Sequence, residues 1–83
     1  MDFNIITTEK FERQTKKLYK KYISIVSDIE KIANQVLEDY QSGISLGNNT
    51  YKIRLAIKSK GKGKSGGGRI IYYVVQPNNE IYF

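Results

Sequence analysis

Positively charged side chains gather in the C-terminal half of this 83-residue chain, around a glycine-rich segment. Lys52, Arg54 and Arg69 stand in two apolar-rich segments on either side of it, where the alternation of β-strands would direct them to one face of a sheet. Four more lysines lie between them: Lys58, Lys60, Lys62 and Lys64. No acidic residue occurs from Tyr51 to Gln76. A surface of this kind has the chemistry to bind a polyanion such as RNA.

The amino-acid composition excludes several kinds of functional site. Cysteine and histidine are both absent, so disulfides, thiolate-metal sites and the usual general base at neutral pH are missing. We therefore expect no metal and no cofactor. The formal net charge of +6 favours partners that carry phosphate groups, or an acidic protein. No apolar run approaches the roughly 20 residues that span a bilayer, and the N-terminus lacks a secretory signal pattern. We expect a cytoplasmic protein with no membrane contact.

The N-terminal half predicts one strand and two helices. Residues 3–7 are β-branched and aromatic, which predicts an opening strand, and Thr8 is placed to cap the helix that follows. Apolar residues at helical spacing predict a second helix over residues 25–40, with Gly43 as its stop. Residues 43–50 are rich in glycine, serine and asparagine, and they predict a loop.

Three further strands are predicted after that loop. Residues 51–58 alternate between apolar and polar types, as in a half-buried strand. Residues 59–67 are too rich in glycine for regular structure, and residues 68–75 form the next strand. A turn at residues 77–79 leads into a last strand over residues 80–83.

This order of elements predicts a two-layer α+β fold in a single domain, residues 1–83. A helical hairpin would cover one face of an antiparallel sheet. The open face would then carry Lys52, Arg54, Arg69, Ile71 and Tyr73. The last strand looks short, so we expect it to leave apolar surface exposed at Ile81, Tyr82 and Phe83.

The chain resembles the RelE/ParE superfamily, the toxins of bacterial type II toxin–antitoxin systems, and in particular its RelE/HigB-like mRNA interferase branch. The resemblance covers the order of elements over nearly the whole chain. It is sharpest in YKIRL (residues 51–55), in the GKGKSGGGR loop that ends at Arg69, and in IIYY directly after it. It implies a RelE-like two-layer fold. Because members of the family normally continue further, it also implies that the last strand and the C-terminal segment are incomplete here.

The resemblance further implies a toxin that acts as a ribosome-dependent mRNA endoribonuclease and inhibits translation and growth. The partners implied are mRNA, ribosomal RNA at the A site and a cognate antitoxin protein. Cleavage in this branch needs no metal, since the ribose 2′-hydroxyl attacks the adjacent phosphate. By motif position the catalytic residues would be Lys52, Arg54 and Arg69. Tyr73, which we expect on the same open face, is a further catalytic candidate.

The side-chain chemistry assigns different roles to these residues. Arginine stays protonated in proteins, so Arg54 and Arg69 would clamp the scissile phosphate through forked hydrogen bonds. Lys52 is the candidate for proton transfer, because neighbouring cations make an ammonium group easier to deprotonate. Tyr73 could stack a base or carry a proton.

Other interpretations stay open. Lys58, Lys60, Lys62 and Lys64 would bind RNA backbone, but a solvated hairpin tip accounts for them equally well. Basic residues on a strand can also serve only to hydrate the face of a sheet. ParE-like gyrase inhibitors share the fold without needing the basic set, and a catalytically inactive toxin-like module would keep only the antitoxin contact. We expect an antitoxin to lie along the helical hairpin, or to add a strand beside the incomplete last strand.

Overall fold

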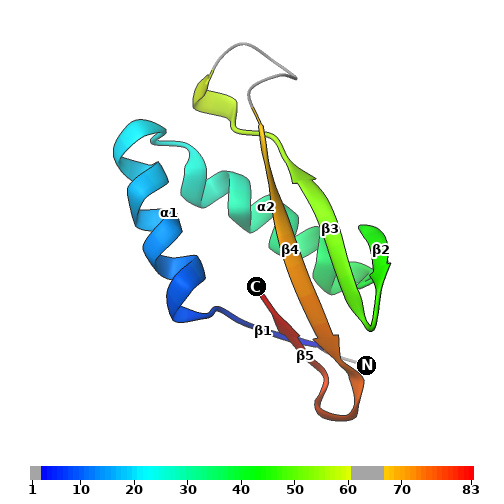
Figure 1. Cartoon of the computed structure of the whole chain (residues 1–83). Helices are drawn as coiled ribbons and strands as arrows, with labels where there is room; N and C mark the ends of the chain where they lie inside the picture. The colour runs from blue at the N-terminus through cyan, green and yellow to red at the C-terminus, as the bar shows by residue number, and fades with distance from the viewer. Residues whose placement is uncertain (1–2, 61–66) are drawn as a thin grey trace.

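The computed structural model describes residues 3–60 and 67–83. Its elements follow in the order β1 (Asn4–Ile6), α1 (Glu9–Lys21), α2 (Ile25–Glu38), β2 (Ile44–Gly47), β3 (Thr50–Leu55), the 3-10 turn η1 (Lys58–Lys60), β4 (Gly68–Val75), the 3-10 turn η3 (Gln76–Asn78) and β5 (Glu80–Tyr82). The five strands form one sheet in the order β1-β5-β4-β3-β2, in which only β1 and β5 are parallel neighbours. The helices form the second layer (Figure 1), which confirms the predicted α+β fold.

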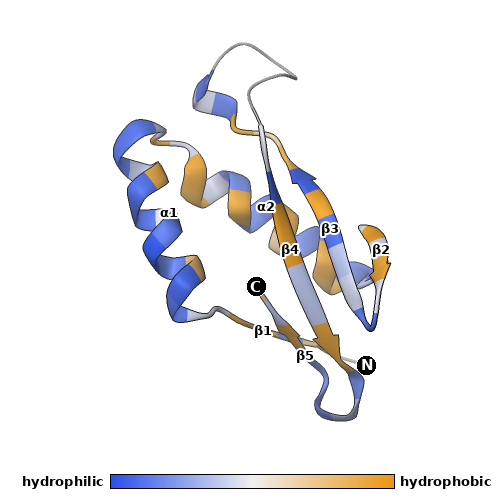
Figure 2. Cartoon of the chain, in the orientation of Figure 1, coloured by the Kyte–Doolittle hydropathy of each residue, from blue (hydrophilic) through white to orange (hydrophobic). Residues whose placement is uncertain are grey.

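Helix α1 begins where the sequence predicts, because Thr8 caps it. The Thr8 hydroxyl accepts a hydrogen bond of 3.2 Å from the backbone N–H of Phe11. Acidic residues in the first turn and lysines in the last turn complement the helix dipole. No residue of α1 is fully buried, although Phe11 and Leu18 pack against the core. Figure 2 shows the mainly hydrophilic character of α1 beside the more mixed α2. Among the described residues neither helix is long and apolar enough to cross a membrane.

The core lies between α2 and the sheet. As predicted, Tyr51, Ile53 and Leu55 of β3 and Ile70, Tyr72 and Val74 of β4 face the helices. The buried set is Ile25, Ile32, Val36, Tyr51, Ile53, Leu55, Ile57, Ile70, Tyr72, Val74, Ile81 and Phe83. Tyr72 is 1% exposed and stacks on Tyr51, with ring centroids 5.3 Å apart. Its hydroxyl donates to the Tyr40 carbonyl across 2.8 Å, so the buried polar group is satisfied.

Gly43 does not end α2, and that prediction is wrong. The helix ends at Glu38, well before the glycine. Gly43 is needed instead for a close approach, since a Cβ there would lie 2.6 Å from the carbonyl oxygen of Lys52 and 2.9 Å from the Tyr72 hydroxyl. Its N–H donates to that hydroxyl across 3.0 Å. The absence of a side chain therefore lets the chain enter β2 directly against the sheet.

The loop predicted over residues 43–50 is wrong in its first half, because Ile44–Gly47 forms the edge strand β2. Asn48 and Asn49, with φ of 51° and 61°, make a two-residue turn that returns the chain into β3. The pairing of β2 with β3 is irregular between Ser45 and Gly47. The turn residues were recognisable in the sequence, but the four residues before them, all of which are exposed, were assigned to the same loop.

The expectation of an exposed, unpaired last strand is also wrong. β5 lies between β1 and β4, so it has partners on both sides and is not a site for strand addition. Ile81 is 0% exposed and Phe83 is 6% exposed. The Phe83 ring packs edge-on against Phe11, with centroids 5.5 Å apart. The outer strands of the sheet are β1 and β2.

Candidate functional site

Strands β3 and β4 place the three strand cations on the face of the sheet opposite the helices. In β3, Lys52 and Arg54 alternate with the buried Ile53 and Leu55. Lys52 is half-buried and Arg54 is exposed. In β4, Arg69 is exposed next to the buried Ile70. The alternation of each strand therefore brings Lys52, Arg54 and Arg69 to one open face.

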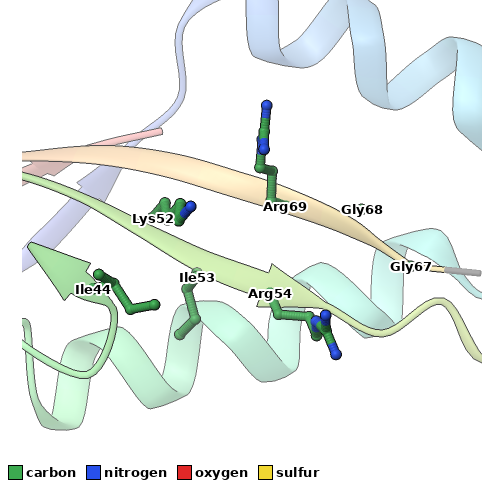
Figure 3. Close-up of a pocket in the computed structure, with 7 residues that line it drawn as sticks. All are labelled: Ile44, Lys52, Ile53, Arg54, Gly67, Gly68 and Arg69. Atoms are coloured by element: carbon green, nitrogen blue, oxygen red, sulfur yellow. The ribbon is translucent and has the colours of Figure 1, made fainter. Parts of the chain in front are cut away.

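Arg54 and Arg69 are direct partners in the antiparallel pairing of β3 with β4. Directly opposed residues have Cβ atoms about 4.5–5.5 Å apart, and like charges at such positions repel. Figure 3 shows the two guanidinium groups directed away from each other, with Lys52 to one side of both, one row further along the sheet. The structure therefore brings the three cations to one face, but their charged ends do not meet at one point. An anion placed between them would relieve the repulsion.

A hollow of about 680 Å³ lies over these residues, lined by Ile44, Lys52, Ile53, Arg54, Gly67, Gly68 and Arg69. Lys52 has an exposed isoleucine on each side, because it is paired with Ile44 of β2 and with Ile71 of β4. Sequence reasoning missed Ile44, whose segment was predicted to be a loop. The hollow thus combines positive charge with apolar walls.

The two strands that carry the cations supply no negative charge. Strands β3 and β4 contain no acidic residue. Among the described residues, the side-chain hydrogen bonds involve none of Lys52, Arg54 and Arg69. Their donor groups are therefore free to bind an anion such as phosphate, and charge-assisted hydrogen bonds of this kind are strong.

A buried carboxylate fixes the chain where it leaves β3 for the glycine-rich segment. Oδ2 of Asp28 accepts hydrogen bonds from the Ser24 hydroxyl at 2.6 Å and from the Lys58 N–H at 3.0 Å. Ser24 in turn accepts from the N–H of Ser59 across 2.8 Å. These contacts hold the η1 turn against the start of α2, so the expectation that residues 59–67 lack regular structure is wrong for the part in η1.

The lysines predicted to lie in the glycine-rich loop differ in their surroundings. Lys58 is exposed on the η1 turn. Lys60 is also on η1, but its Nζ lies over the ring of Tyr22 at 5.2 Å from the centroid, as in a cation–π contact. The structure therefore directs Lys60 towards the end of α1. Lys62 and Lys64 lie outside the described residues.

Tyrosines occupy the other end of the open face. Tyr73 is 47% exposed and follows Arg69 and Ile71 on the same side of β4. Its partner in β5 is Tyr82, which sequence reasoning had treated only as exposed apolar surface. Tyr82 alternates with the buried Ile81, and that alternation was the signal that could have placed it on the open face.

Tyr82 is tied to Glu80 of the same strand. Its hydroxyl donates a hydrogen bond of 2.8 Å to Glu80 Oε1. This hydrogen bond, together with burial and the negative charge of Glu80, raises the pKa of Tyr82 above 10.0. The folded protein therefore favours the neutral phenol of Tyr82 over its tyrosinate.

A second surface feature lies on the helical hairpin. Tyr19, Ile23 and Val26 are large apolar residues with exposed fractions of 51%, 76% and 50%. They line an open groove of about 560 Å³ with Lys16 and Glu30 among its polar residues. An apolar patch of this kind is a candidate contact for another protein.

No protein-family model matches this chain, and no curated protein matches it. The function of the chain must therefore be inferred from the open face itself. That face has an opposed arginine pair, a lysine between two isoleucines, and a pair of tyrosines one row further along the sheet.

Proposed function

We propose that this chain is a RelE/HigB-like toxin of a type II toxin–antitoxin system, a cytoplasmic mRNA endoribonuclease that acts on the ribosome and stops translation and growth. One observation carries the proposal. Arg54 and Arg69 are opposed on an open sheet face with Lys52 beside them, and their strands contain no acidic residue. The two guanidinium groups repel each other when no anion is bound, and a phosphate would neutralise them. Such a pair is more typical of an RNA-cleaving site than of a surface that is only hydrated.

The reaction proposed is transfer of the phosphate to the adjacent ribose hydroxyl. The 2′-hydroxyl loses its proton as its oxygen forms a bond to phosphorus, the bond from phosphorus to the 5′-oxygen breaks, and the 5′-oxygen takes up a proton. The products are a 2′,3′-cyclic phosphate and a free 5′-hydroxyl. Arg54 and Arg69 turn inward to hold the non-bridging oxygens, where negative charge develops. Both side chains are exposed, so neither is fixed in place by burial.

Lys52 is proposed to move a proton in this reaction. It lies on the same face, one row along the sheet from the opposed arginines, and it is more buried than either of them. Its position would allow it to contact the attacking or the leaving oxygen once the arginines hold the phosphate. Lys58, at the fixed base of the glycine-rich segment, adds a contact to the RNA backbone without sequence preference.

The proposed antitoxin would inhibit by covering the basic face or by docking on the helical hairpin. The apolar groove around Tyr19, Ile23 and Val26 supports the second mode. The first mode is supported by the exposed apolar residues beside the cations, Ile44 and Ile71. An acidic partner segment would complement the chain's net charge of +6 in either position.

The test is inducible expression in bacteria with mapping of mRNA 5′ ends. The wild type is compared with Arg69→Ala and with Arg13→Ala, which removes an exposed arginine from α1. We expect growth arrest and new cuts inside translated frames for the wild type and for Arg13→Ala, with both effects lost in Arg69→Ala. Arrest without cuts, unchanged by Arg69→Ala, would favour a gyrase inhibitor. Absence of both effects in the wild type would favour an inactive antitoxin-binding module.

A further inference from the structure

Two tyrosines stand directly opposite each other on the open face. Tyr73 of β4 and Tyr82 of β5 are Cα partners in the antiparallel pairing. The strand alternation places them on the same side, since their neighbours Val74 and Ile81 are both buried. β4 and β5 lie side by side in Figure 1. Residues opposed in this way have Cβ atoms about 4.5–5.5 Å apart, so two aromatic side chains share one row of the open face, and together they define an aromatic surface.

This surface differs from an aromatic core pair. Tyr73 is 47% exposed although neighbouring tyrosines of the sheet, Tyr51 and Tyr72, are buried and already stacked on each other. Tyr82 is half-buried, and its hydroxyl is fixed by the 2.8 Å hydrogen bond to Glu80. A ring that is held in place loses little conformational entropy when a ligand packs on it.

The two tyrosines lie further along the same face of the sheet as the three cations. Tyr73 stands four positions along β4 from Arg69, which is about 13 Å at about 3.3 Å per residue. Lys52 is closer, because it pairs with Ile71 and so lies on the diagonal to Tyr73, at about 7–8 Å. A single strand whose phosphates contact Arg54, Arg69 and Lys52 would therefore carry its next bases over the tyrosines. Glu80 bounds this end, where a phosphate would be repelled.

We propose that Tyr73 and Tyr82 form a base-stacking platform for single-stranded RNA, which continues the phosphate-binding site of Lys52, Arg54 and Arg69. The inference rests on the proposed function, and it defines the substrate class as RNA with unpaired, unstacked bases. Aromatic residues on the open face of a sheet are a general means of binding such bases, because every base has a stacking face. Paired RNA would hide its bases from this surface.

The experiment uses the whole chain and two probes. One is a short single-stranded RNA, and the other is the same sugar–phosphate chain with abasic sites at its internal positions. Tyr73→Leu and Tyr82→Leu keep apolar bulk but remove the ring, and Tyr73→Phe and Tyr82→Phe keep the ring. Tyr19→Leu, on the exposed side of α1, is the matched control. Thermal unfolding of each variant verifies its fold.

We expect each leucine variant to bind the complete RNA roughly 5- to 150-fold more weakly than the wild type, which is the effect of removing the stacking of one base. The phenylalanine variants and Tyr19→Leu should bind within about twofold of the wild type, since they keep the rings of the platform. On the abasic chain all of these proteins should bind alike, whereas Arg69→Ala should weaken binding to both probes.

Three results would overturn the inference, and they separate it from the proposed function. If the leucine variants bind the complete RNA as tightly as the wild type does, the tyrosines do not stack on bases, and the proposed phosphate site is unaffected by that result. If they lose the same factor on both probes, the tyrosines act on the fold or on the backbone, and the platform is again wrong. If the wild type binds neither probe, even when ribosomes are present, the platform and the proposed function both fail.

Discussion

The backbone N–H of Lys58 donates a hydrogen bond of 3.0 Å to Oδ2 of Asp28, a carboxylate that is only 4% exposed and lies in the first turn of α2. The two residues are thirty positions apart in the chain. The contact connects the start of the core helix to the point where the chain leaves the basic strand β3. Through it, packing of the helix layer determines where the first loop lysine lies.

Replacement of Asp28 by alanine should destabilise the fold. The N–H of Lys58 and the hydroxyl of Ser24 would both lose a charged acceptor at a part-buried position, which costs about 1–3 kcal/mol in the free energy of unfolding. Urea unfolding measures the loss, and faster amide exchange at Lys58 locates it. Ser27→Ala, at an exposed position of the same turn, is the control and should stay near wild type. An Asp28→Ala variant as stable as wild type would show that the contact does not hold the η1 turn.

A side chain at Gly43 should be poorly tolerated. In Gly43→Ala the new Cβ would meet the Lys52 carbonyl oxygen at 2.6 Å, so the start of β2 must shift. We expect a loss of about 1–3 kcal/mol, which lowers the melting temperature by about 4–8 °C per kcal/mol in a domain of this size. Gly68→Ala is the matched control, because no atom lies within 4 Å of the Cβ that it adds. Equal melting temperatures for the two variants would contradict this role of Gly43.

Removal of one opposed arginine should change stability and the rate of RNA cleavage in opposite directions. Arg69→Ala relieves the repulsion with Arg54, which should stabilise the fold by about 0.2–1 kcal/mol at low salt. The same change should lower the rate of RNA cleavage by roughly 10²–10³-fold, the usual cost of losing one donor to a developing charge. Unfolding at low and high salt separates the effects, because added salt should remove the gain. A destabilised Arg69→Ala would indicate that the arginines pack rather than repel.

The salt dependence of RNA binding should distinguish Lys58 from Lys60. Removing a lysine that binds one phosphate should lower the slope of log affinity against log salt by about 0.7 for a single strand. Lys58→Ala should show this change. Lys60→Ala should leave the slope unchanged and instead lower stability by about 0.5–1 kcal/mol, because Lys60 contacts the ring of Tyr22. Equal slope changes for the two variants would mean that Lys60 leaves Tyr22 to bind RNA.

The hydrogen bond between Tyr82 and Glu80 predicts a loss of stability at alkaline pH. The pKa of Tyr82 is raised in the folded protein from 10.0, so the folded state favours the neutral phenol. The contribution is complete below pH 10 and disappears as the pH rises through the folded value. Tyrosinate absorbance and melting temperature across this range test it. Glu80→Gln should shift the Tyr82 titration to lower pH, and an unchanged titration would contradict the assigned cause.

Much of the candidate site could be predicted from local pattern. Alternation in β3 and β4 was enough to place Lys52, Arg54 and Arg69 on one face, because successive side chains of a strand point to opposite sides. The N-cap at Thr8 was likewise a local signal, since the hydroxyl bonds three residues ahead. The environment of Ile44 was missed, because its strand is short and wholly exposed, and only pairing with β3 defines it.

The sequence by itself determined the order of the two helices and of strands β1, β3, β4 and β5, the basic face and the buried face of each central strand, since these depend on residue type and spacing along the chain. Only the tertiary structure decided that β5 is internal, that Gly43 is required by the approach of Lys52 and Tyr72, and that Tyr82 stands opposite Tyr73. Each of these follows from contacts between segments far apart in the chain. Such contacts depend on which strand edges and side-chain volumes meet in the folded state, and neighbouring residues carry no signal for them.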